Sequence, residues 1–168
     1  MAGYGTDSGF NDWLAAQGLT LPADAQPVAV LRAIGSAYVD GAYEGRLQCS
    51  RRTDGFEQEL AWPRTGHSVN GQAVPSDLIP TPWVHASYRA AYLQATSAGW
   101  ANSGRDPSRV TKREKVDVIE REFFASGEAG TTGNAAPGFN VDPLIDGMLS
   151  VWLCGDTGRD PSSLFLVI

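Results

Sequence analysis

Residues 81–98 read TPWVHASYRAAYLQATSA and carry the clearest helical pattern of the chain. Thr81 followed by Pro82 is typical of a helix start, because proline fits the first turn and a threonine can cap it. Apolar side chains then recur at i, i+4 and i+7 from Val84, and alanines flank this stripe. The pattern predicts a long helix at 83–98 that lets another helix approach closely.

Three further helices are predicted on either side of this one. Residues 24–43 place Leu31, Ile34 and Tyr38 on one stripe, with Asp24 as the N-cap. Asp142-Pro143 repeats the helix-start signal before a final helix that ends near Gly155. A short helix is predicted over residues 10–18.

The remaining segments predict strands and long connections. Residues 109–125 alternate in character and favour one or two strands, which we expect to form one arm of a hairpin. With 19 glycines and 10 prolines the chain is richer than average in turn residues. The fold class we predict is therefore mainly α: a small helical bundle with a β-hairpin or strand arm and long Gly/Pro-rich loops.

Length and charge narrow the class of protein. The chain has 168 residues, 42% of them hydrophobic, which predicts one soluble domain over residues 1–155 with a mobile N-terminus, and a C-terminal extension over 156–168. The formal net charge of −6 gives no general attraction for nucleic acid or anionic membranes. No apolar run approaches the roughly 20 residues that span a bilayer, and the start has no secretory signal, so we expect synthesis in the cytoplasm.

The sequence offers no constellation for catalysis, a cofactor or a metal ion. The nucleophile elbow, the Walker loop and the Rossmann glycine pattern are all absent. His67 and His85 have no ligand partner at helical spacing, and we expect both at the surface or an interface. Cys49 and Cys154 form no CxxC pair, so we predict neither a disulfide nor a metal site. The protein is expected not to be an enzyme.

Aromatic and arginine residues leave two interpretations open. The five tryptophans and five tyrosines could stack on single-stranded bases, but most lie on apolar helix stripes, which favours core packing and subunit contacts. The arginines that could hold phosphates beside Trp62 are Arg46, Arg51, Arg52 and Arg64. The chain finishes with five apolar residues, Leu164, Phe165, Leu166, Val167 and Ile168. They could form the last strand of the domain's own sheet or an arm that docks on a neighbouring subunit.

The most distinctive stretch is LAWPRTG at residues 60–66, followed by Gly71 and by VPSDLIP at 74–80. Together with KREKV at 112–116, it resembles a family of tailed-bacteriophage structural proteins, the head-to-tail adaptor or head completion proteins. Members of this family often carry the label "DnaT-like single-stranded DNA-binding protein". The resemblance runs from about Pro22 to Gly155, and this chain departs from it in the Gly-rich N-terminus and in the tail after Gly155.

The resemblance implies a virion structural protein at the head–tail junction. Such a subunit forms a ring, of 12 copies in the family, between the portal protein and tail or nozzle proteins, and DNA passes through its channel without sequence-specific binding. It implies no catalytic residues, cofactor or membrane contact. The residues we expect to contact a partner or another subunit are Trp62, Pro63, Arg64, Thr65 and Gly66 with the apolar tail; the alternative for the Trp62–Gly66 turn is a clamp within its own loop. The alternative function is a single-stranded DNA-binding module of phage replication.

Overall fold

A computed structural model describes residues 3–101, 104–105, 111–115, 120–123 and 138–154. The α-helices are α1 (Asp7–Ala16), α2 (Val28–Tyr43), α3 (Thr81–Thr96) and α4 (Pro143–Leu149), joined by the short 3-10 helices η1 (Glu44–Arg46), η2 (Gly55–Glu57) and η4 (Ser150–Trp152). The strands are β1 (Arg51–Arg52), β2 (Arg64–Thr65), β3 (Ser68–Val69), β4 (Gln72–Ala73), β5 (Gly104–Arg105), β6 (Thr111–Lys115), β7 (Glu120–Phe123) and β8 (Gly138–Phe139). Across these described ranges, none of the helices is both long and apolar enough to cross a membrane.

All four predicted helices are confirmed, with corrections at their starts. The N-cap of α4 is Asp142, whose carboxylate accepts hydrogen bonds from the main-chain N–H groups of Leu144 and Ile145 at 3.0 and 3.1 Å. The helix α2 begins at Val28 and not near Asp24, because the extended Pro27 precedes it and a proline keeps its predecessor out of the helical region. The helix α3 begins at Thr81, with Pro80 at the cap position.

The prediction of a mainly α bundle is wrong, because the described chain is mixed α and β. Its strands form two-stranded antiparallel sheets, in which β1 pairs with β2, β3 with β4, β5 with β8 and β6 with β7. The predicted hairpin is confirmed by the β6–β7 pair, in which Glu114 faces Arg121. The Gly/Pro-rich connection between α2 and α3 contains the short strands β1 to β4, because buried main-chain polar groups need partners and these ladders supply them. Ring assembly, which belonged to the same prediction, is not shown by the structure.

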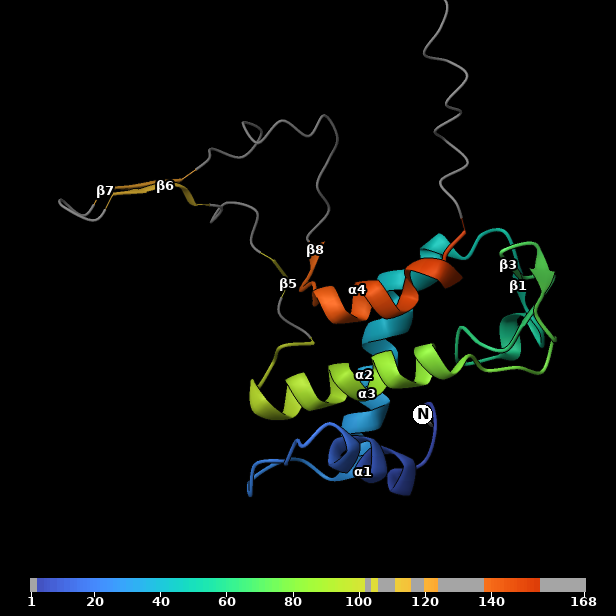
Figure 1. Ribbon diagram of the computed structural model, residues 1–168, viewed down its shortest axis with the longest axis horizontal. Helices are drawn as coiled ribbons and strands as arrows, with labels where there is room; N and C mark the ends of the chain where they lie inside the picture. Colours follow the sequence, from blue (N-terminus) through green and yellow to red (C-terminus); the bar gives the residue numbers. More distant parts are fainter. Residues whose placement is uncertain (1–2, 102–103, 106–110, 116–119, 124–137, 155–168) are drawn as a thin grey trace, which may run out of the picture.

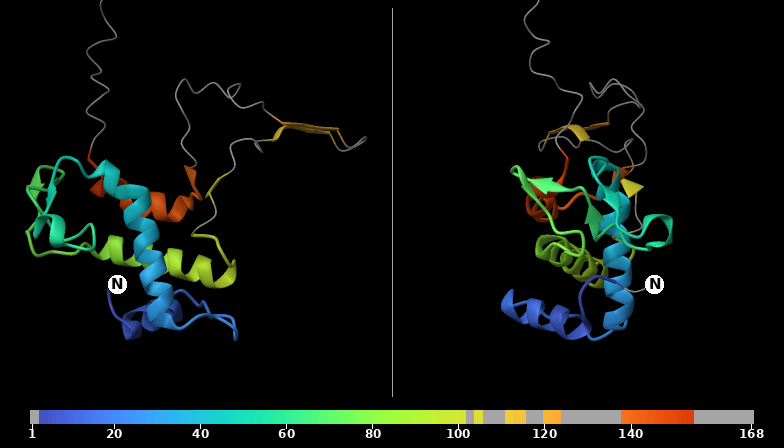
Figure 2. Two further views of the ribbon diagram at one scale, coloured as in Figure 1. Left: turned by 180° about the vertical axis from the view of Figure 1, so that it is seen from behind. Right: turned by 90° about the vertical axis from the view of Figure 1, so that its right-hand side faces the viewer.

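The helices cross one another around α2 (Figures 1 and 2). In both figures α3 crosses α2 near its middle, with α1 beside one end of α2 and α4 toward the other. A Cβ atom on Gly35 of α2 would lie 2.2 Å from the Ser87 carbonyl oxygen and 2.7 Å from the Ala91 nitrogen of α3. The close approach predicted from the alanines of α3 is therefore confirmed, and it also requires a glycine on α2.

The N-terminal segment, which we expected to be mobile, lies along α2. The main-chain N–H of Tyr4 donates to Ser36 Oγ at 2.9 Å. The guanidinium of Arg32 donates to the carbonyl oxygens of Gly3, Tyr4 and Gly5, and pairs with Asp7 at 2.7 Å. The glycines that suggested mobility instead allow close contact, since a Cβ on Gly3 would meet the Arg32 main chain at 2.7 Å.

Asp40 of α2 is a buried carboxylate that joins four parts of the chain. Its Oδ1 accepts hydrogen bonds from the Tyr4 hydroxyl at 2.8 Å and from Trp83 Nε1 at 2.9 Å, and its Oδ2 accepts one from the Ala61 N–H at 2.8 Å. The Tyr4 hydroxyl in turn accepts from the Trp62 N–H at 3.1 Å. Burial raises the pKa of Asp40, and these hydrogen bonds oppose the shift because they favour the charged form.

Replacing Asp40 by asparagine tests this arrangement. We expect Asp40→Asn to lower the free energy of unfolding by about 2–5 kcal/mol, because in either orientation the amide NH₂ would face the Trp83 Nε1–H or the Ala61 N–H, which can only donate. Urea unfolding followed by tryptophan fluorescence measures the change. Asp12→Asn, on the exposed side of α1, is the matched control and should change stability by less than about 0.5 kcal/mol. Equal stabilities for the two variants would contradict the prediction.

Candidate functional site

The candidate site is the loop between α2 and α3, which contains the distinctive sequence at residues 60–66. We call residues 44–67 the Arg64 loop. In this loop β1 and β2 pair so that Arg52 faces Arg64 and Arg51 faces Thr65. A positive φ of 78° at Gly66, where a residue with a side chain would be strained, then turns the chain out of β2 toward His67.

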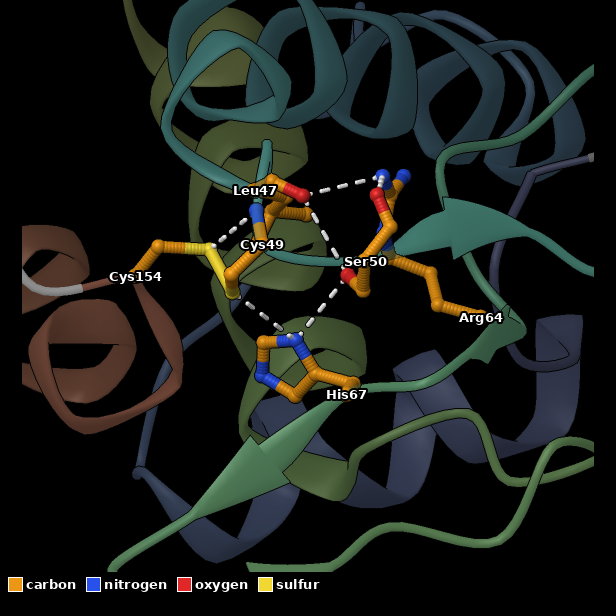
Figure 3. The surroundings of a disulfide bond; sticks show 6 residues. All are labelled: Leu47, Cys49, Ser50, Arg64, His67 and Cys154. Carbon is orange, nitrogen blue, oxygen red and sulfur yellow. Dashed lines mark hydrogen bonds between the residues drawn. A yellow bond between two sulfur atoms is a disulfide. The ribbon is translucent and has the colours of Figure 1, made fainter.

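Arg64 is 5% exposed and closes the loop on itself. Its Nε donates to Ser50 Oγ at 2.8 Å, and Nη1 donates to the Ala61 carbonyl at 3.1 Å. Nη2 donates to the carbonyl oxygens of Leu47 and Ser50 at 3.1 and 2.6 Å (Figure 3). Glu44 lies 3.4 Å from Nη1 and supplies the countercharge. The guanidinium is thus engaged by its own loop, as in the clamp alternative.

Trp62 is equally inaccessible, at 1% exposed. Its ring centroid lies 5.8 Å from those of Trp83 and Trp152 and 4.9 Å from that of His67. The aromatic side chains of this region therefore form core, as the sequence analysis favoured, and Trp62 is not available to stack on a base. The Trp62–Pro63 peptide bond is cis.

The other predicted contact residues fall into two groups. Pro63 is partly buried, and its carbonyl oxygen accepts from Gln58 Nε2 at 3.0 Å. Thr65 is half-buried and Gly66 is exposed, so these two remain accessible to a partner. The five residues of the apolar tail, 164–168, lie outside the described residues, as does the domain boundary predicted at 155/156.

Of the four arginines of the loop, Arg46 and Arg51 are exposed, whereas Arg52, like Arg64, is engaged within the loop. Arg52 donates to both carboxylate oxygens of Glu44, at 2.7 and 2.6 Å, which lowers the pKa of Glu44. Arg46 and Arg51 are exposed, and neither has an ion-pair partner in the part of the chain that the structure describes. Phe56 is also fully exposed, at 105%. Beside Arg51 a shallow hollow of about 330 Å³ is lined by Gln48, Cys49, Ser50, Arg51, Thr65 and Gly66.

Cys49 and Cys154 are joined by a disulfide, which corrects the sequence prediction. The residues lie 105 positions apart, and no local pattern signals the pairing. They meet because the chain after η4 returns to the Arg64 loop, where the Cys154 N–H donates to the Arg46 carbonyl at 3.0 Å. Figure 3 shows the His67 ring facing this disulfide.

His67 is also corrected, because it is 2% exposed and not a surface residue. Its Nδ1 lies 3.0 Å from Ser50 Oγ and 3.8 Å from Cys49 Sγ. Burial lowers the pKa of His67, and the nearby Trp152 main chain offsets only part of this effect. A neutral ring is therefore expected near pH 7. The other histidine, His85, is half-buried on α3.

Asp40 was missed by the sequence analysis, although a signal was present. It is the only acidic residue of α2 and lies next to an apolar stripe. The prediction of a helix start at Asp142 is confirmed, because Asp142 caps α4, and Asp146 of the same helix accepts a hydrogen bond from the Tyr43 hydroxyl at 2.6 Å.

The fold and the Arg64 loop define a small mixed α and β protein whose most distinctive turn is closed on itself. Residues 3–163 match the family model described as "Putative DnaT-like ssDNA binding protein". The chain therefore belongs to this DnaT-like family, in agreement with the label attached to the resemblance. Comparisons with curated proteins and with solved structures gave no match.

The Glu44–Arg52 pair makes stability depend on pH. Because the folded state lowers the pKa of Glu44, the unfolded chain binds the proton at higher pH. The pair's contribution is therefore complete above the ordinary glutamate pKa of about 4.3 and is lost as pH falls through the lower folded pKa. We expect Glu44→Gln to cost roughly 1–2 kcal/mol near pH 7 and progressively less as pH falls below about 4. Urea unfolding at a series of pH values measures this difference. The exposed Glu59→Gln is the control, and a cost for Glu44→Gln that is the same at every pH would contradict the assignment.

Proposed function

We propose that this protein is a non-catalytic binding protein whose ligand is single-stranded DNA. The observation that carries the proposal is the match of nearly the whole chain, residues 3–163, to a family described as ssDNA binding. The net charge of −6 means that binding must come from a local surface and not from the charge of the molecule as a whole.

Arg51 and Phe56 are the residues of the Arg64 loop best suited to this role. Single-stranded DNA is bound by cationic groups that track phosphates and by aromatic rings on which bases stack. Phe56 is the large hydrophobic side chain with the greatest exposure among the described residues, and Arg51 lies on the neighbouring β1. The hollow of about 330 Å³ next to Arg51 gives a phosphate room to approach. Arg46 is the other exposed arginine of the Arg64 loop, and we refer to the exposed residues Arg46, Arg51 and Phe56 together as the Phe56 surface.

The acidic residues around Phe56 limit the affinity. Asp54, Glu57 and Glu59 are exposed on the same loop and repel phosphates. Binding through two arginines should therefore be weak, with a slope of log K against log salt of about −1.4 for a single strand.

Titration of a fluorescently labelled oligonucleotide at low salt tests the proposal. We expect Phe56→Ala to weaken binding about tenfold by loss of stacking, and Arg51→Gln to weaken it and to flatten the salt slope. The control is Gln26→Glu, which changes the net charge by the same amount as Arg51→Gln at an exposed position before α2. If wild type does not bind at low salt, or if Gln26→Glu weakens binding as much as Arg51→Gln, the Phe56 surface is not a DNA site.

A second candidate function rests on an apolar row along α4 and η4. Leu144 in the first turn of α4 and Val151 in η4 are 61% and 53% exposed and lie seven residues apart, a spacing typical of one side of a helix. Val141, which is 55% exposed, lies just before α4. Exposed apolar rows of this kind are typical of docking surfaces. We propose that this row contacts a portal or tail protein in a virion, which is the partner class implied by the phage adaptor resemblance.

Co-migration with a purified portal protein tests the second candidate. We expect the Leu144→Lys, Val151→Lys double variant to lose co-migration in size-exclusion chromatography and to retain the DNA affinity of wild type, because the two surfaces are separate. Ser150→Lys, which adds a charge at an exposed position beside the row, is the matched control. Co-migration of the double variant at the wild-type level would remove this candidate.

A further inference from the structure

Three side chains of types that can ligate a metal ion lie close together beside the hollow of the Arg64 loop. Cys49 follows η1, His67 follows β2, and Cys154 follows η4. Their ligand atoms all lie within 4.8 Å of one another. Sulfur and imidazole nitrogen are the ligands that Zn²⁺ prefers. A disulfide needs no histidine beside it, yet the His67 ring faces this one (Figure 3).

The spacing of two of these atoms already suits a tetrahedral metal. A Zn–S bond of about 2.3 Å and a Zn–N bond of about 2.0 Å at the tetrahedral angle place sulfur and nitrogen about 3.6 Å apart. Cys49 Sγ and His67 Nδ1 are 3.8 Å apart. Cys154 Sγ has to withdraw from Cys49 Sγ to about 3.8 Å, and Cys154 lies just after η4 and outside regular secondary structure.

The surroundings would support thiolates and hold the imidazole in place. The Cys49 N–H points at Cys154 Sγ at 3.0 Å, and a hydrogen bond of this kind favours a thiolate. The His67 ring is fixed between Trp62 and Trp152, at centroid distances of 4.9 and 6.5 Å. If Nδ1 leaves Ser50 Oγ for a metal, that hydroxyl keeps the Leu47 carbonyl as its acceptor at 3.2 Å.

We propose that, in the reduced chain, Cys49, Cys154 and His67 form a three-ligand site for a thiolate-preferring divalent cation of the Zn²⁺ class. The disulfide and the metal are then alternative occupants of one place. The described residues supply three ligands, which leaves a fourth position for water on the side of the hollow. This inference is independent of the proposed DNA binding.

The interconversion balances with a dithiol reductant. The reductant's electron pair breaks the Cys49–Cys154 bond, two thiols form, and the dithiol becomes a disulfide. Metal binding then releases the two thiol protons, while His67 binds through a neutral nitrogen. Oxidation of the loaded site by a disulfide-forming oxidant would expel the cation and restore the structure described here.

Cobalt titration of the full chain tests the site, because Co²⁺ reports thiolate ligands and tetrahedral geometry by its absorption. The chain is first reduced with a phosphine, and circular dichroism follows its fold. We expect one Co²⁺ per reduced chain with a sulfur-to-cobalt band, displacement by Zn²⁺, and no binding by the oxidised chain. Cys49→Ser and Cys154→Ser should abolish the band, and His67→Gln should weaken binding at least about tenfold.

His85→Gln is the matched control, since the chain has two histidines and His85 is not part of the cluster. It should bind Co²⁺ as wild type does. The proposal is overturned if the reduced, folded wild type shows no sulfur-to-cobalt band, or if His67→Gln binds as tightly as His85→Gln. If reduction unfolds the chain, the site requires Co²⁺ to restore the helical signal, and failure to restore it also overturns the proposal.

Discussion

The buried carboxylate of Asp40 is the constraint on which the remaining structure depends. A charge removed from water is stable only when donors surround it, and these donors come from the N-terminal segment, the Arg64 loop and α3. If any one of these segments moved away, the Asp40 carboxylate would lose a hydrogen-bond donor and would be left incompletely paired. The interaction explains why the glycine-rich segment around Tyr4 is held in place and why the Arg64 loop, which has little regular structure, keeps a defined shape. Packing of α2 on α3 and the Asp40 network stabilise the same crossing.

Sequence reasoning succeeded where the signal was local. The cap at Asp142, the stripe of α3 and the alternation in β6 and β7 depend on residues close together in the chain, and all three are confirmed. It failed where a partner is distant. Strands of two residues, such as β1 and β2, show no periodicity, so the mixed character of the fold could not be predicted. The Cys49–Cys154 bond and the burial of His67 depend on where η4 returns, which no spacing along the chain encodes.

The Arg64 loop shows that the most distinctive residues of a sequence need not be its contact surface. In the sequence, Trp62 and Arg64 looked suited to contact nucleic acid or a partner. In the structure both are buried, and Arg64 donates its hydrogen bonds to carbonyl oxygens of its own loop. An arginine can satisfy several carbonyl oxygens at once, which a loop poor in regular structure requires. The exposed residues that we propose for function belong to no distinctive sequence motif. They are one phenylalanine, two arginines and an apolar row on α4 and η4. The surfaces that we propose for function consist of residues that remain exposed once Arg64 has bound its own loop.

The connection between Cys49 and Cys154 also determines how the molecule would carry mechanical load. In the oxidised chain, tension that enters before Cys49 and leaves after Cys154 crosses the covalent bond between the two sulfur atoms. Residues 50–153, which include α3 and α4, are bypassed by this bond and are not stretched. Among the described helices, α1, α2 and η1 lie in the stretched path. Pulling would thus stretch α1 and α2 directly, and the part enclosed by the disulfide would lose its contacts with α2 and Asp40 without being stretched itself.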